Sequence, residues 1–324
     1  MTRLYIFLFL CLLGQGYFYA QVPEACKSTR VACPAKNINN CQEKVAFDEQ
    51  RNIYLLRKDY ATPYSGNCTS CYSNFLVEEK LYFENGKREG RDTSYYRTGC
   101  IQAIQEYHVG LQNGSTTIFY DSTQWKQFEI WYKNGVLDGP SIQFNRNERQ
   151  DTLMLKNYAN GKLHGEQRSY LPNGKLRKVT HYNNGLLDGP MYTLTEKGSK
   201  ESQLNYKNGK KNGVWTYYFD SGKTARIENW KDGKKNGEFK TFDERGQVLN
   251  SENYLTDIPV GKHESYYTDG KLSYSCTFSN KGEKIEEFVI DEYGVKKQLF
   301  PQAQPNNIES PKENKANPNN KSKN

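Results

Sequence analysis

The sequence has few residues of the kinds that build catalytic or metal centres, and few aliphatic residues. Of 324 residues only four are histidine and three methionine, and the mean hydropathy is −0.92. The four histidines share no metal-like spacing; they are His108, His164, His181 and His263. No carboxylate pair stands out for general acid–base chemistry, and no phosphate-binding loop is present. We therefore expect no enzyme, no metal site, no cofactor and no deep globular core.

Long apolar runs are also missing, apart from one short run at the start. Arg3 precedes an apolar stretch over residues 4–13, and Ala20 precedes Gln21. A charged start, a short apolar run and a small residue are typical of a secretory signal. Residues 1–20 are therefore predicted to be a signal peptide, with an uncleaved membrane anchor as the alternative. No other segment is long and apolar enough to cross a bilayer. We expect a secreted or periplasmic protein, or one associated with the cell envelope.

What the sequence does contain is a repeat marked by glycine. Segments such as Asn208-Gly209-Lys210-Lys211-Asn212-Gly213 recur, and we call their two glycines the first and second glycine of a repeat. The second glycines Gly165, Gly189, Gly213, Gly237 and Gly261 are 24 residues apart. A third glycine keeps the same step, as in Gly222 and Gly246. Looser copies extend the series to about nine units between Tyr60 and Gly294. A fixed period of this size indicates a repeat array.

Two columns of aromatic or apolar residues follow the same period. The first aromatic column stands three residues before the first glycine mark: Phe83, Tyr107, Tyr132, Tyr158, Tyr182, Tyr206, Trp230 and Tyr254. The second aromatic column stands five residues after the second glycine: Cys71, Tyr95, Phe119, Phe144, Tyr170, Leu194, Tyr218, Phe242 and Tyr266. No apolar recurrence at helical spacing lies between them, so the segments are predicted to be strands. Whether the two columns share a sheet face depends on register, which stays open.

The turn residues complete the repeat. Asn-Gly favours the positive φ angles that a type I′ hairpin requires. The residue before the second glycine is Asn113, Asp138, His164, Asp188, Asn212 or Asn236. These residue types tolerate the left-handed region better than most. Each unit is thus predicted to be one β-hairpin. The predicted fold is all-β: an extended single-layer antiparallel sheet built from tandem 24-residue hairpins.

These residues resemble the MORN repeat, and more closely its bacterial variant, which has the pattern Tyr-x-Asn-Gly-Lys-x-x-Gly. The segment from Tyr206 to Gly222 is the cleanest match, and the resemblance covers roughly residues 60–294. The resemblance implies a hairpin array. Proteins of this type are often labelled YwqK-type antitoxins of toxin–antitoxin systems, so it also implies an antitoxin-like role that no residue pattern supports by itself.

The cysteines cluster before residue 101. Without Cys11 of the predicted signal the chain has seven, and an odd number leaves at least one without an intramolecular partner. In an oxidising compartment, Cys26, Cys33, Cys41, Cys68, Cys71 and Cys100 are disulfide candidates that would staple a cap over the first hairpins. A redox or metal role for Cys68 and Cys71 is the alternative. The repeat phase places both in a strand, whereas redox pairs of this spacing usually begin a helix.

The predicted organisation has four parts. Residues 1–20 form the signal peptide, 21–59 a cysteine-rich cap, 60–298 the repeat array, and 299–324 a disordered polar tail. The tail is rich in Pro, Asn, Lys and Glu.

A long repetitive surface without a reactive cluster favours a non-catalytic scaffold that binds another protein. An exposed aromatic strip usually marks a partner site. The predicted contact residues are Tyr132, Tyr158, Tyr182, Tyr206, Trp230, Tyr254, Tyr170, Tyr218, Phe242 and Tyr266. Attachment to an envelope glycan or an anionic lipid surface is an alternative, since loop lysines such as Lys87, Lys211 and Lys235 could form a basic strip in a chain of formal charge +8. Export argues against a nucleic-acid partner, and the oligomeric state stays open.

Overall fold

The computed structural model describes residues 26–27, 30–33 and 40–301 and divides the chain into two compact units. The first unit comprises the residues up to Gly189 together with 196–198. The second comprises 190–195 and the residues from Ser199 on. The predicted signal peptide and residues 302–324 of the predicted tail lie outside the described residues.

The first unit contains one short helix and a series of antiparallel strands. Its elements are α1 (Cys41–Lys44), β1 (Val45–Asp48), β2 (Ile53–Leu56), β3 (Gly66–Cys71), β4 (Val77–Glu84), β5 (Lys87–Arg88), β6 (Gly90–Tyr95), β7 (Ile101–His108), β8 (Leu111–Phe119), β9 (Lys126–Lys133), β10 (Val136–Phe144), β11 (Thr152–Ala159), β12 (Lys162–Leu163), β13 (Gly165–Tyr170), β14 (Leu176–Asn183) and β15 (Leu186–Leu187). Strands β1 and β2 pair only with each other among the named strands, and the sheet of the unit begins at β3.

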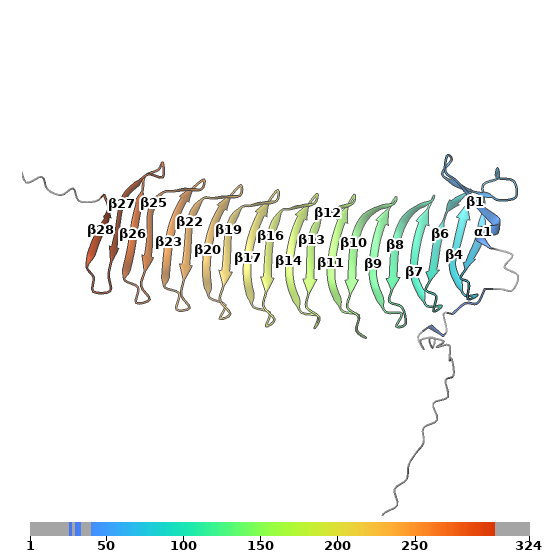
Figure 1. Ribbon diagram of the computed structural model, residues 1–324, viewed down its shortest axis with the longest axis horizontal. Helices are drawn as coiled ribbons and strands as arrows, with labels where there is room; N and C mark the ends of the chain where they lie inside the picture. The colour runs from blue at the N-terminus through green and yellow to red at the C-terminus, as the bar shows by residue number, and fades with distance from the viewer. Residues whose placement is uncertain (1–25, 28–29, 34–39, 302–324) are drawn as a thin grey trace, which may run out of the picture. The chain divides into compact units, whose positions relative to one another are not determined.

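The second unit consists of strands alone in its described residues. Its elements are β16 (Gly189–Leu194, from Pro190 on), β17 (Lys200–Lys207), β18 (Lys210–Lys211), β19 (Gly213–Tyr218), β20 (Thr224–Lys231), β21 (Lys234–Lys235), β22 (Gly237–Phe242), β23 (Val248–Leu255), β24 (Ile258–Pro259), β25 (Gly261–Tyr266), β26 (Leu272–Phe278), β27 (Lys284–Ile290) and β28 (Lys296–Phe300). Within each unit, consecutive strands lie side by side as antiparallel neighbours (Figure 1). The predicted all-β fold of tandem hairpins is confirmed.

Each repeat is one hairpin whose returning strand is interrupted. In β17–β18–β19, Tyr206 pairs with Lys211 beside the turn, and Ser202 pairs with Tyr217 farther along. The register shifts between these pairs because Asn212 and Gly213 form a bulge, where φ of Gly213 is +85°. A bulge adds a residue to one strand and bends it. This is why a two-residue strand and then a six-residue strand follow every eight-residue strand in the regular repeats.

The Asn-Gly turns have the predicted conformation. In Asn208-Gly209 the φ angles are +48° and +77°, and Asn160-Gly161 has +49° and +77°. Both φ angles are positive, as the predicted type I′ turn requires.

The residues before the second glycine have a different role from the predicted one. Asn212 and its equivalents are absent from the described non-glycine residues with positive φ. In four of these residues, Asn113, Asp138, Asn212 and Asn236, the side chain instead accepts a hydrogen bond from the next hairpin. Asn212 Oδ1 accepts from the backbone N–H of Asp232 at 3.3 Å, and Asp138 Oδ2 accepts from that of Asn160 at 3.1 Å. These residues therefore join consecutive turns along one edge of each sheet.

The cap is held to the first hairpins by three disulfides: Cys26–Cys100, Cys33–Cys71 and Cys41–Cys68. All six predicted candidates are thus paired. Cys68 and Cys71 both lie in β3 and pair with Cys41 and Cys33, so they form neither a disulfide with each other nor a pair of free thiolate ligands. The remaining described cysteine, Cys276, is free and buried. Three disulfides indicate an oxidising environment.

The core beneath the cap is small and aromatic. Phe83 is fully buried and packs against Tyr54 and Tyr64, with ring centroids at 4.7 and 5.7 Å.

The C-terminal end of the array differs from its predicted end. Strand β28 pairs with β27 and reaches Phe300, so the regular array extends past the predicted boundary at residue 298. None of the described helices is long and apolar enough to span a membrane.

Candidate functional site

A ladder of rings runs across the second unit. We use the term ring ladder for Tyr206, Trp215, Trp230, Phe239, Tyr254, His263 and Phe278, whose successive ring centroids are 5.1, 5.9, 5.4, 5.3, 5.2 and 4.9 Å apart. Tilted and edge-to-face contacts at this distance contribute about 0.5–1.5 kcal/mol each beyond burial. The ring ladder thus takes the place of an aliphatic core in this sheet.

Every second rung of the ring ladder comes from a column that the sequence analysis missed. Trp215, Phe239 and His263 stand two residues after the second glycine. Trp215 and Phe239 are almost fully buried, at 4% and 9% exposure. Their own 24-residue period is visible in the sequence and could have revealed them.

Two lysines expected in a basic strip lie over these rings instead. Lys211 Nζ is 4.3 Å from the Trp215 centroid and 4.0 Å from that of Trp230. Lys235 Nζ lies 4.3 Å from the Tyr254 centroid. Cation–π contacts of this kind stabilise the ring faces and cover them. These lysines therefore belong to the packing of the second unit.

The ten predicted contact residues are all half-buried. The structure brings Tyr206, Trp230 and Tyr254 into the ring ladder. The others, in both units, have the same intermediate exposure: Tyr132, Tyr158, Tyr182, Tyr170, Tyr218, Phe242 and Tyr266. The second aromatic column makes no ring contact with the ladder among the described residues, and the Tyr266 hydroxyl donates to Glu264 Oε2 at 2.7 Å. Partner contact through these ten residues stays a prediction.

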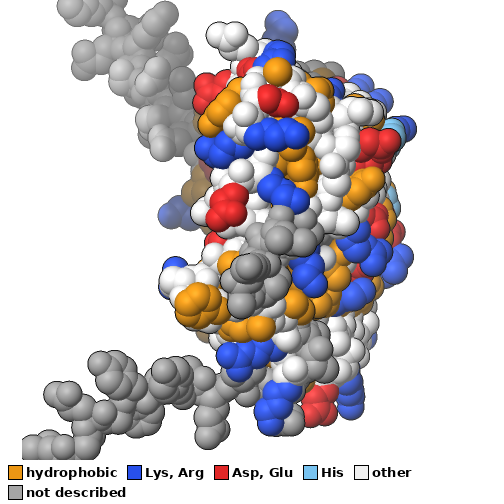
Figure 2. All heavy atoms as spheres, turned by 90° about the vertical axis from the view of Figure 1, so that its right-hand side faces the viewer, with side chains coloured by type: hydrophobic (Ala, Val, Ile, Leu, Met, Phe, Trp, Pro, Cys, Tyr) orange, Lys and Arg blue, Asp and Glu red, His pale blue; other side chains and the backbone are white. Residues whose placement is uncertain are grey.

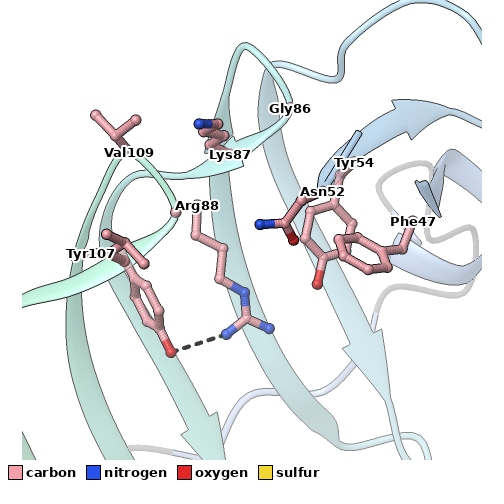
Figure 3. Close-up of a pocket in the computed structure, with 10 residues that line it drawn as sticks. Phe47, Asn52, Tyr54, Gly86, Lys87, Arg88, Tyr107 and Val109 are labelled. Carbon is pink, nitrogen blue, oxygen red and sulfur yellow. Dashed lines mark hydrogen bonds between the residues drawn. The ribbon is translucent and has the colours of Figure 1, made fainter. Parts of the chain in front are cut away.

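A hollow of the first unit lies where the cap meets the first hairpins. This cap hollow has a volume of about 440 Å³ and is lined by Phe47, Asn52, Tyr54, Gly86, Lys87, Arg88, Tyr107, Val109, Gly110 and Leu111. Figure 3 shows Tyr107 and Arg88 on one side, Tyr54 and Phe47 on the other, and Asn52 between them. Phe47, Val109 and Leu111 are each 50% exposed. In Figure 2, which views the molecule from the side of the cap, hydrophobic side chains lie among Lys and Arg side chains.

The guanidinium of Arg88 is held in place in the cap hollow by its neighbours. Arg88 Nη1 donates to the Tyr107 hydroxyl at 3.2 Å, and its guanidinium lies 5.2 Å from the centre of that ring. The same nitrogen is 3.6 Å from Asp92 Oδ2. Asp92 is 2% exposed, and burial raises its pKa to about 6. The lining therefore presents two cations, Lys87 and Arg88, beside exposed apolar side chains, and no carboxylate.

This arrangement suits binding more than chemistry. Among the described residues no group of three or more His, Cys, Asp or Glu could hold a metal ion. The lining of the cap hollow contains no His, Cys, Asp, Glu, Ser or Thr side chain. The cap hollow was not predicted from the sequence, because its two sides come from segments far apart in the chain.

Comparison with protein families matches four segments to the MORN repeat variant: residues 163–184, 211–232, 235–255 and 259–280. The chain therefore contains MORN-variant repeats, as the resemblance implied. Each matched segment of the second unit contains a ring-ladder residue, such as Trp230 or Tyr254. The MORN repeat is generally a non-catalytic scaffold.

Comparison with curated proteins gives no match. Among solved structures, the chain is similar to a Tc holotoxin pore from Photorhabdus luminescens, with 11% identity and a TM-score of 0.18 over 79% of this chain and 16% of that one. A second similarity is to the TcdB2–TccC3 complex, with 10% identity and a TM-score of 0.14 over 75% of this chain and 20% of that one. The chain thus spans a fifth or less of the length of these proteins.

Proposed function

We propose that the protein is a non-catalytic scaffold that acts outside the cytoplasm and binds another protein at the cap hollow. The predicted signal peptide and the three disulfides support the location. A binding role without catalysis agrees with the repeat class and with the lining of the hollow.

The observation that carries this proposal is the conformation of Val109. Its φ is +50°, the left-handed turn position that Asn85 and Asn134 occupy in the neighbouring hairpins. A β-branched residue is strained there, by roughly 1–3 kcal/mol. Half of its surface is exposed, so burial in the free protein does not offset this cost. A partner that covers Val109 would supply the missing burial.

The surroundings of Val109 indicate the chemistry of the partner. Leu111 and Phe47 provide further exposed apolar surface, and Arg88 and Lys87 provide positive charge in the lining. The carboxylate of Glu89 lies outside the lining and accepts from the N–H of Val109 at 2.8 Å. Aromatic and arginine side chains dominate protein-binding energy when they are desolvated at the centre of an interface. The disulfides fix the cap before binding, which reduces the ordering cost. The fitting partner presents an apolar side chain flanked by carboxylates.

The test compares Val109→Asn with Leu186→Asn, the same change at an apolar, 53% exposed residue that directly follows the Asn184-Gly185 turn. Both variants and the unchanged protein would be used to capture proteins from the extracytoplasmic fraction of the source cells. Captured proteins would then be purified and titrated directly. We expect Val109→Asn to unfold at higher denaturant, by about 1 kcal/mol, and yet to bind the partner at least about tenfold more weakly.

Leu186→Asn should bind as the unchanged protein does. The proposal is wrong if every captured protein binds all three forms equally, or if no protein binds directly. The stability readout separates loss of contact from loss of fold, because the binding-deficient variant is the more stable one.

A further inference from the structure

The second unit has a hollow of its own on the ring-ladder face, which we call the sheet hollow. Its volume is about 390 Å³, and it crosses β20, β22 and β23. Trp230 and Phe239 line it with rings that meet edge to face at 5.4 Å. The same hollow contains hydroxyl, amide, cationic and carboxylate groups from the three strands. It combines a small apolar floor with several polar groups.

Strand register places the polar groups in rows. Arg226 pairs with Thr241, and Thr241 pairs with Asn250, so these three side chains lie abreast on one face. Asn250 Nδ2 donates to Thr241 Oγ1 at 2.9 Å, and Asn250 Oδ1 accepts from the hydroxyl of Ser265 at 2.8 Å. Neighbouring strands are about 4.8 Å apart. The row therefore offers donors and acceptors at a regular interval.

The two carboxylates of the sheet hollow are fixed by neighbours. Glu228 accepts from the indole N–H of Trp230 at 3.0 Å and pairs with Arg226 Nε at 3.1 Å. Glu252 accepts from the Tyr254 hydroxyl at 2.8 Å. Positioned groups lose little entropy when they bind a ligand.

The first unit has a hollow at the same place in the repeat, three repeats earlier. Its volume is about 190 Å³, and Gln167 and Ser169 stand where Phe239 and Thr241 stand in the sheet hollow. Met154 corresponds to Arg226, and Lys178 corresponds to Asn250. The bulged hairpin therefore produces a hollow in either unit. The ring floor and the polar row of the sheet hollow depend on the particular side chains of the second unit.

We propose that the sheet hollow binds a neutral saccharide, as one site along a linear glycan. A sugar ring has an apolar C–H face, which fits the half-buried ring of Trp230, and hydroxyl groups at its rim, which fit Thr241, Asn250 and the two carboxylates. Phe239 is 9% exposed and packs beneath Lys235, so it supports this surface from below. Binding pockets of this type are apolar with a few fixed polar groups. The cations Arg226 and Lys235 are balanced by Glu228 and Glu252, and the third cation of the lining, Lys240, is paired with Glu238 at 2.7 Å, so the lining does not favour an anion.

The polar row also continues beyond the sheet hollow. Tyr217 pairs with Arg226 on one side, and Ser265 pairs with Asn250 on the other. A ligand that extends across several strands gains contacts along this row. A linear chain of sugars meets that condition.

The experiment titrates the full chain with two neutral probes, the β-1,4-linked hexamers of glucose and of N-acetylglucosamine, and with polygalacturonate as the anionic comparator, by calorimetry. We expect one neutral hexamer to bind with a Kd of roughly millimolar or tighter. Raising the salt from about 0.1 to about 0.5 M, where screening is strong, should change this Kd by less than about twofold.

The variants are Thr241→Val and Asn250→Ala, with Ser169→Ala at the equivalent place in the first unit as the control. The first two should weaken binding about tenfold or more, and the control should leave it unchanged. Far-ultraviolet circular dichroism checks that each variant is folded. Absence of binding by both neutral hexamers, salt-sensitive binding of polygalacturonate alone, or equal binding by all three variants would overturn the proposal. None of these outcomes bears on the cap hollow, which lies in the other unit.

Discussion

The indole nitrogen of Trp215 donates a hydrogen bond to the backbone carbonyl of Asn205, at 2.7 Å, across the bulge that interrupts the hairpin. Other repeats make the same contact with different side chains. Gln167 Nε2 donates to the carbonyl of Asn157 at 3.0 Å, and His263 Nε2 lies 2.7 Å from that of Asn253. A bulge leaves the strand ladder locally incomplete. The side chain two residues after the second glycine fills that gap.

The first prediction follows from this contact. Trp215→Phe should retain the ring contacts but lose the hydrogen bond, at a cost of about 1–2 kcal/mol in the free energy of unfolding. Val214→Thr, on the exposed neighbour, should change it by less than about 0.5 kcal/mol. Urea unfolding of both variants, followed by circular dichroism, measures the difference. Equal stabilities would show that the indole bond does not stabilise the bulge.

The repeat shows how far sequence reasoning reaches in this protein. Asn208-Gly209 predicts its turn because the required φ angles are local properties of those two residues. The Trp215–Trp230 contact depends on strand register, which a one-residue slip would reverse. The first aromatic column was therefore predictable as a column, whereas its alternation with Trp215, Phe239 and His263 was not predicted.

The cap shows a second limit. The cysteine count predicts a stapled cap, but six cysteines allow about fifteen pairings, so Cys26–Cys100 could not be assigned from spacing. The cap hollow could not be predicted from the sequence for a similar reason. Phe47 and Val109 line it together only because the β1–β2 hairpin docks on the first repeat. That docking has no local sequence signal.

The second prediction tests this docking. The N–H of Gly86 donates to the carbonyl of Tyr64, and the carbonyl of Gly86 accepts from the N–H of Tyr54, both at 2.7 Å. A Cβ at Gly86 would lie 2.7 Å from the Tyr54 oxygen, whereas one at Gly222 would meet nothing within 4 Å. Both glycines have positive φ, so alanine costs roughly 1–2 kcal/mol of strain at either.

Gly86→Ala should therefore destabilise the protein more than Gly222→Ala, and should speed hydrogen exchange at the Tyr54 amide. Gly222→Ala should leave that amide protected. Similar losses of stability, with Tyr54 equally protected in both variants, would contradict the role of Gly86 in docking.

The third prediction concerns the disulfides. Cys26–Cys100 closes a sequence separation of 74 residues and Cys41–Cys68 one of 27. Loop-closure entropy then predicts losses of roughly 4.5 and 3.5 kcal/mol when either pair is replaced by serine. Hydrogen exchange should show the loss in the first unit. The described part of the second unit has no disulfide, so its amides around Trp230 should keep their protection. Exchange that rises equally in both units would contradict this.

The last prediction concerns the buried carboxyl of Asp92. Burial raises its pKa to about 6, with Arg88 at 3.6 Å and the backbone N–H of Tyr82 at 3.1 Å acting against the rise. The charge of Glu79 adds to it. In the unfolded chain the pKa is near about 3.9. Between these values the folded state binds more protons at Asp92 than the unfolded state, so the contribution of Asp92 to stability is fully present below about pH 4 and is lost as the pH rises through about 6.

Asp92→Asn removes the titrating group and keeps an oxygen to accept from Tyr82. At pH 8 the variant should be more stable than the unchanged protein by up to roughly 3 kcal/mol, and at about pH 4 the two should be nearly equal. Asp269→Asn is the control, because the N–H of Lys271 lowers the pKa of this exposed carboxyl and no gain at alkaline pH is expected. Denaturant unfolding at both pH values measures the difference. If Asp92→Asn is less stable at the higher pH, the ion pair with Arg88 outweighs the cost of burying the charge, and the pH dependence must have another origin.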